Sequence, residues 1–91
     1  MNYKIVQTEL YKKRALKFLR KNPHMMAKYI KSMDMLEINP FHPSLRLHKL
    51  QGQLSEYHSV SIDLSYRMVI EFIIKENEII PIDIGTHDEV Y

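Results

Sequence analysis

The sequence contains no cysteine, and this absence removes three kinds of chemistry at once. It excludes disulfide bonds, zinc sites built on thiolates, and thiol nucleophiles. A chain without disulfides fits a reducing cytosol. Only two glycines are present, so the sequence also lacks a glycine-rich phosphate-binding loop.

Long hydrophobic stretches are absent as well. The longest apolar run, residues 68–74, is interrupted by Glu71, whereas a membrane-spanning helix needs about 20 apolar residues. The first 20 residues alternate charge and apolarity and contain no hydrophobic region of a signal peptide. We therefore expect a soluble, cytoplasmic protein with no membrane partner. Its length predicts a single domain, residues 1–91, which can fold without covalent crosslinks.

Positive charge is concentrated in the first third of the chain. Residues 1–31 hold nine lysines and arginines against one acid, a net charge of +8, and residues 32–91 hold four against ten, a net charge of −6. Such a division favours a surface that meets a polyanion such as a nucleic acid. Two solvated, lysine-rich helices would give the same pattern. Charge alone therefore suggests a partner without identifying it.

Apolar residues recur with helical spacing after a short strand predicted at residues 3–6. Thr8 is placed to cap a helix that runs to about Asn22, and Pro23 to begin a second helix that runs to about Glu37. The apolar stripe of the first helix is Tyr11, Ala15, Phe18 and Leu19, and that of the second is Met26, Tyr29, Ile30, Met33 and Leu36. The short connection predicts an antiparallel helical hairpin.

Beyond Pro43 the apolar period changes to two, which predicts β-strands. Strands are expected near residues 45–48, 59–64, 66–74 and 78–84. In the last strand one face carries Ile80, Ile82 and Ile84. Pro81 takes the other face, and because proline has no N–H, this strand should lie at a sheet edge or the ladder should skip the proline. The predicted fold class is α+β, in the order β-α-α-β-β-β, with the helical hairpin packed on a mostly antiparallel sheet.

The second face of this sheet is predicted to be polar and open. It displays Arg46, His48, Ser61, Asp63, Arg67 and Glu71. This set is richer in charge and hydrogen-bonding groups than solvation requires. A functional site is expected there.

Three stretches of the sequence resemble the RelE/ParE superfamily of toxins, and the length and element order agree with it. These are Leu50-Gln51-Gly52 with residues 57–62 beyond it, the run Tyr66 to Ile70, and the tail Gly85 to Tyr91. The Gly-Thr-His of the tail, followed by an acid and a terminal aromatic, is most similar to the YafQ-like branch. The resemblance implies a RelE-like toxin of a type II toxin–antitoxin system, a ribosome-dependent endoribonuclease that cleaves mRNA without a metal or other cofactor. The implied partners are a cognate antitoxin, mRNA and ribosomal RNA.

The resemblance also implies catalytic residues. His87 matches the histidine of the tail, His48 matches the histidine just before the Leu-x-Gly turn, and Tyr91 takes the place of the terminal aromatic. Arg67 matches the arginine of the Tyr-Arg pair in RelE-like members.

Two positions depart from the branch. Ser61 stands where a further histidine is expected, and Ser65 stands where an aspartate precedes an aromatic. The lysines that RelE-like members carry on the strand before the Tyr-Arg pair are also absent. These departures leave the identity of the general base open.

Metal-free RNA cleavage needs a base for the 2′-OH proton, a cation for the charged transition state and an acid for the departing 5′-oxygen. Histidine serves both proton transfers because its usual pKa of about 6.5 keeps both forms accessible, so His87 is predicted to be a general acid or base. The planar fork of Arg67 suits phosphate contact and transition-state stabilisation. A cross-strand pair of Arg67 with Glu71 or Asp63 is the structural alternative.

The remaining candidates contact the substrate or the ribosome. Tyr91 is predicted to stack on a base or move a proton, and the alternative is a docked tail. His48 is predicted to act in catalysis or substrate contact, Arg46 to bind a phosphate, and Ser61 to contact RNA. Lysines of the first helix are predicted to contact ribosomal RNA: Lys12, Lys13 and Lys17. His58 is in phase with the buried positions and is predicted to be a half-buried structural histidine.

A metal site is not expected, because no pair of ligands has the spacing of a helix-face motif and no acidic cluster reaches one point. Two other functions stay open. A ParE-like toxin of the same fold would poison DNA gyrase, although that branch lacks the histidine-bearing tail. A catalytically weak nucleic-acid-binding module would use the basic helices, and Ser61 and Ser65 at expected catalytic places keep this reading open.

Overall fold

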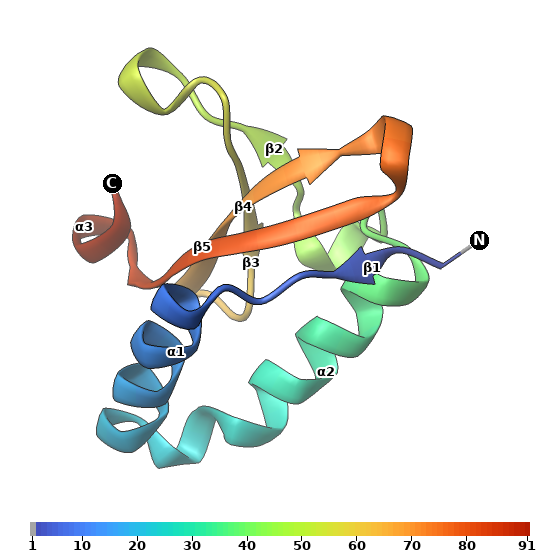
Figure 1. Cartoon of the computed structure of the whole chain (residues 1–91). Helices are drawn as coiled ribbons and strands as arrows, with labels where there is room; N and C mark the ends of the chain where they lie inside the picture. The colour runs from blue at the N-terminus through green and yellow to red at the C-terminus, as the bar shows by residue number, and fades with distance from the viewer. Residues whose placement is uncertain (1) are drawn as a thin grey trace.

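A computed structural model describes residues 2–91, apart from the side chain of Ile74, and shows helices packed against a five-stranded sheet (Figure 1). The strands are β1 (Lys4–Ile5), β2 (His48–Lys49), β3 (His58–Ser61), β4 (Tyr66–Ile73) and β5 (Glu78–Thr86), and the helices are α1 (Glu9–Lys21), α2 (Met26–Ile38) and α3 (His87–Val90). The strand order is β1-β5-β4-β3-β2, with β1 parallel to β5 and every other pair antiparallel. The predicted α+β class, with helices packed on a mostly antiparallel sheet, is confirmed.

Helix α1 begins where its capping residue predicts. Thr8 is extended, and its side-chain oxygen accepts a hydrogen bond of 3.1 Å from the N–H of Tyr11, which satisfies a donor that the first helical turn leaves free. The predicted stripe is buried at Tyr11, Ala15 and Phe18. The lysines of α1 therefore point away from the sheet. Within residues 2–91, no helix is both long and apolar enough to cross a membrane.

Helix α2 buries only part of the predicted stripe, Tyr29 and Leu36, with Met33 packed against the core. Residues Pro23–Met25 form a short 3-10 helix first, so α2 itself begins at Met26. Met26 and Ile30 are 45 % and 50 % exposed, which corrects their assignment to the core. The buried residues of this segment are Met25, Tyr29, Ser32 and Leu36. Figure 1 shows α1 and α2 running in opposite senses and spreading apart from their connection, as a V rather than a tight hairpin.

A bulge in β5 accommodates its proline. Val69 of β4 pairs with Asp83, but the next residue, Ile70, pairs with Pro81, so Ile82 is the extra residue between them. A bulge of this kind interrupts the ladder where proline cannot donate. Strand β5 lies between β1 and β4, so the proline sits at a ladder irregularity instead of a sheet edge.

The bulge also changes which side chains of β5 reach the core. Ile79, Pro81 and Ile84 are buried, whereas Ile80 and Ile82 are only half-buried. The predicted common face of the three alternating isoleucines is therefore wrong, because the period of two is broken by the extra residue. In β4 the alternation holds: the core cluster includes Met68 and Ile70, with Tyr66 and Phe72 packed against it.

The predicted strand at residues 45–48 is mostly a turn. Residues Pro43–Leu45 form a 3-10 helix, and Arg46 has left-handed backbone geometry (φ 48°). Strand β2 is then only two residues long. The period-two pattern failed here because Leu45 reaches the core from a turn.

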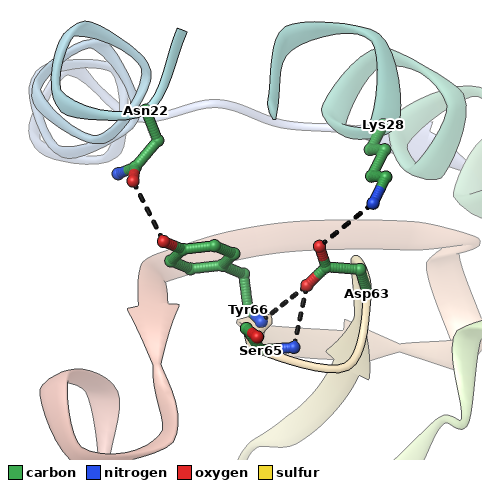
Figure 2. A network of polar contacts seen from close by, with 5 residues as sticks. All are labelled: Asn22, Lys28, Asp63, Ser65 and Tyr66. Atoms are coloured by element: carbon green, nitrogen blue, oxygen red, sulfur yellow. Dashed lines mark hydrogen bonds and ion pairs between the residues drawn. The ribbon is translucent and has the colours of Figure 1, made fainter. Parts of the chain in front are cut away.

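The turn between β3 and β4 is held by polar contacts to both helices (Figure 2). The carboxylate of Asp63 accepts hydrogen bonds from the N–H groups of Ser65 and Tyr66, both 2.9 Å, and lies 3.4 Å from the ammonium of Lys28 on α2. The hydroxyl of Tyr66 donates to the side-chain oxygen of Asn22 at the end of α1, at 3.0 Å. These contacts fix where β4 begins.

The sequence had predicted that Asp63 lies on the open face of the sheet. In the structure it lies in the turn before β4 and contacts Lys28 of α2. Partial burial opposes its ionisation, but the hydrogen bonds from the Tyr66 and Ser65 N–H groups and the contact with Lys28 outweigh burial and lower the pKa of Asp63.

Candidate active site

The short helix α3 brings His87 and Tyr91 together. The side chain of Thr86 accepts a hydrogen bond from the N–H of Glu89 (3.3 Å), and the carboxylate of Glu89 accepts one from the N–H of Thr86 (2.9 Å). This reciprocal capping box fixes the first turn. Residues four apart lie on one side of a helical turn, and the rings of His87 and Tyr91 meet edge to face with centroids 4.4 Å apart.

Tyr91 reaches from α3 to the far side of β4. Its hydroxyl donates a hydrogen bond to the hydroxyl of Ser59 on β3, and Ser59 is only 1 % exposed. Because β4 lies between β5 and β3, the tyrosine crosses over β4. There the guanidinium carbon of Arg67 lies 5.8 Å from the centroid of the Tyr91 ring, within the range of a cation–π contact.

Ser59 is a site residue that sequence reasoning missed. It has the same period-two phase as Ser61, and so belongs to the polar face of the sheet. That phase was the available signal. Its partner could not be found in the same way, because the contact depends on the tail folding back across β4.

Arg67 is half-buried on β4, opposite Ser61 on one side and Gly85 on the other. Its Nε atom is buried and has no hydrogen-bond partner among the described residues. Within residues 2–91 it forms no ion pair, so the predicted alternative of a cross-strand pair with Glu71 or Asp63 is not observed.

His48 and His87, 39 positions apart in the sequence, line the same hollow. The hollow measures about 520 Å³. Its lining consists of His48, Lys49, Leu50, Gln51, Gln53, Leu54, His87 and Tyr91. The carbonyl oxygen of Arg46 accepts a hydrogen bond of 2.9 Å from the Nδ1 of His48, and in the neutral ring this bond leaves a lone pair on Nε2. The Nδ1 of His87 lies 3.5 Å from the exposed carboxylate of Asp88, a weak contact in solvent.

Arg46 and Ser61 do not line this hollow. They line a smaller one of about 220 Å³ with Ser44, Asp63 and Leu64. The left-handed backbone at Arg46 takes its side chain out of the alternation with His48 that the sequence had predicted. Ser61 nonetheless lies directly across the ladder from Arg67.

The three lysines predicted to meet RNA are exposed on α1. The ammonium of Lys12 lies 3.4 Å from the carboxylate of Glu9 in an exposed pair. Lys17 lines a hollow between α1 and α3, together with Lys21 and Glu89. The basic helix α1 therefore lies beside the tail that carries His87 and Tyr91.

His58 is half-buried, as its phase predicts. Its ring lies 5.8 Å from that of Phe72, centroid to centroid. Burial lowers the pKa of His58, and the neighbouring charges of Lys49 and His48 lower it further. Among residues 2–91 there is no group of three or more side chains placed to ligate a metal ion.

Comparison with known proteins gives a match at the level of structure. No family model and no curated protein sequence matches the chain. YafQ from E. coli strain BL21(DE3) superposes with a TM-score of 0.79 over 98 % of both chains at 19 % identity. An E. coli DinJ–YafQ toxin–antitoxin complex matches with a TM-score of 0.77 over 100 % of this chain and 99 % of that one at 22 % identity. A YoeB–YefM complex from Staphylococcus aureus matches with a TM-score of 0.70 over 96 % and 99 % at 19 % identity. The chain has the fold of these YafQ and YoeB structures.

Proposed function

We propose that this chain is the toxin of a type II toxin–antitoxin pair, and that it cleaves mRNA on the ribosome without a metal ion. It would act as a single cytoplasmic domain and be silenced by a cognate antitoxin. The observation that carries the proposal is the meeting of His87, Tyr91 and His48 at one hollow, with the guanidinium of Arg67 against the tyrosine ring. The fold supports the class of protein, since the similar structures include toxin–antitoxin complexes.

Two imidazoles at one hollow can perform both proton transfers of RNA cleavage. We assign the base to His48, whose Nε2 is free because its Nδ1–H is held by a carbonyl oxygen. It removes the 2′-OH proton as the 2′-oxygen attacks phosphorus. His87 donates a proton to the 5′-oxygen as the bond from phosphorus to that oxygen breaks. Each positioned transfer contributes about 10²–10⁴-fold.

Arg67 supplies the cation. Its guanidinium carbon lies 5.8 Å from the centroid of the Tyr91 ring, and its planar fork suits contact with a phosphate. The negative charge that develops on the phosphate is largest in the transition state, so a fixed guanidinium lowers the barrier. The Tyr91 ring, 38 % exposed, offers a face on which an unpaired base can stack.

The test is expression of matched histidine variants from a titratable promoter, with growth and mRNA 5′ ends followed together. His24 is exposed on the 3-10 turn before α2 and serves as the control position. The wild type and His24→Ala should arrest growth and produce new mRNA ends, and His87→Ala should do neither. Arrest by His87→Ala without new ends would contradict the nuclease. A DNA cleavage assay with gyrase would then test the ParE-like alternative.

A further inference from the structure

We propose that Glu89 is a positioning residue that, with Thr86 and Gly85, holds α3 so that His87 and Tyr91 reach the substrate hollow. The inference rests on the proposed function, because it concerns the two side chains that would act on RNA. Glu89 itself lines the hollow between α1 and α3, on the side that faces Lys17 and Lys21. It does not line the hollow shared by His48 and His87, so it acts through α3 and not on the substrate.

Helix α3 is not held by any fully buried side chain of its own. It is four residues long and contains no buried residue, and a helix this short is not stable by itself. Val90 is half-buried and packs near Gly85, and polar contacts order the two ends of the helix. The capping box of Thr86 and Glu89 satisfies two free N–H groups at the start, and the bond from Tyr91 to Ser59 anchors the end.

Gly85 lets Glu89 close over the end of β5. A Cβ atom at residue 85 would lie 3.0 Å from the carboxylate oxygen of Glu89 and 3.2 Å from its Cβ, closer than ordinary van der Waals contact. Gly85 is also the ladder partner of Arg67. The absence of a side chain at residue 85 therefore lets α3 lie close to the strand position of Arg67.

The charge of Glu89 suits this role. Hydrogen bonds from the backbone N–H and side chain of Thr86 lower its pKa, and the charges of Lys21 and Lys17 lower it further. The group is thus ionised at neutral pH and accepts the Thr86 N–H strongly. An acid at the first turn also interacts favourably with the helix dipole.

Two matched pairs of variants test the proposal. Thr86→Val keeps the shape and removes the hydroxyl, whereas Thr86→Ser keeps the hydroxyl. Glu89→Ala removes the acceptor, whereas Glu89→Gln keeps one. Loss of a cap changes the population of a short helix by about tenfold, so Thr86→Val and Glu89→Ala should lower kcat for mRNA cleavage on ribosomes about tenfold. KM should change less than kcat, and Thr86→Ser and Glu89→Gln should stay within about threefold of wild type.

A second readout does not depend on cleavage. Nuclear Overhauser effects between the His87 and Tyr91 rings should be strong in the wild type, Thr86→Ser and Glu89→Gln, and weak in the other two. Glu37→Gln, an exposed acid on α2, is the control. Retained ring contacts in Thr86→Val and Glu89→Ala would overturn the positioning role, and so would lost contacts with unchanged kcat. A wild type that cuts no RNA would overturn the proposed function, while the ring contacts would still decide whether the cap orders α3.

Discussion

The hydroxyl of Tyr91 is hydrogen-bonded to the hydroxyl of Ser59, which precedes it by 32 positions in the sequence. The bond carries the tail across β4 and lays the tyrosine ring near the Arg67 guanidinium. One polar contact thereby links three parts of the candidate site: the tail, the strand with the cation and the strand beyond it.

Removal of this bond should lower the free energy of unfolding, because the bond attaches the tail to the sheet. Ser59→Ala is expected to lower the free energy of unfolding by about 1 kcal/mol, the usual net value of such a bond. Tyr91→Phe should cost a similar amount, and the double variant should cost less than the sum because both remove one interaction. Urea denaturation measures all three. Ser61→Ala, two residues along the same strand, is the control, and additive losses would contradict the contact.

Arg67→Met should separate stability from activity. The Nε of Arg67 is buried without an acceptor among the described residues, so an apolar side chain of similar length should leave the free energy of unfolding unchanged or raise it by about 1 kcal/mol. Cleavage should fall at least about 10²-fold, because the cation near the phosphate is lost. Arg67→Lys keeps the charge but not the fork, and should recover only part of the rate. A large loss of stability in Arg67→Met would show that the guanidinium has a structural role instead.

His58 should make the fold sensitive to mild acid. Its pKa is lowered in the folded protein, whereas in the unfolded chain it is about 6.5. Above about pH 6.5 both states are neutral and the stabilising contribution is complete, and as the pH falls below that value the unfolded chain takes up the proton first and stability is lost.

His58→Phe should therefore show a smaller decrease in Tm between neutral pH and mildly acidic pH than the wild type. His24→Phe, at an exposed position, should keep the wild-type decrease. Thermal unfolding followed by circular dichroism at the two pH values measures both. An equal decrease in His58→Phe would assign the acid sensitivity to other groups.

Reversal of charge on α1 should weaken ribosome binding in a salt-dependent way. Replacement of Lys12, Lys13 and Lys17 by glutamate is expected to lower affinity and to reduce the slope of log affinity against log salt, because fewer counterions are released. The control carries the same change in net charge at three other exposed lysines: Lys4, Lys31 and Lys75. Equal effects of the two variants would mean that net charge, and not the face of α1, determines binding.

Local signals in the sequence predicted α1 and β4 well. The cap at Thr8 and the alternation from Tyr66 to Phe72 depend on neighbouring residues only. The face of α2 was predicted only in part, because Met25 of the preceding 3-10 helix, and not Met26, enters the core. The β5 bulge was missed because it is a property of the register between two strands.

The candidate site, like the fold, could be predicted only in part from the sequence. His87, His48 and Tyr91 could be named from the resemblance to the RelE/ParE superfamily, and they share one hollow. The contact of Ser59 with Tyr91 could not be predicted, since it depends on the path of the tail over the sheet, whereas the spacing of Thr86 and Glu89 is a capping pattern that was overlooked. Arg46 was misplaced because its left-handed backbone has no strong signal in an arginine.

The parallel pairing of β1 with β5 also constrains the order of events during synthesis. Lys4 finds its partner, Glu78, only when most of the polypeptide has been translated, because a chain emerges from the exit tunnel N-terminus first. Until then β1 has no partner strand, and α3, which carries His87, has not been synthesised. A polypeptide in this condition lacks the hollow that His48, His87 and Tyr91 line together, so the candidate site forms only after translation has passed the last strand.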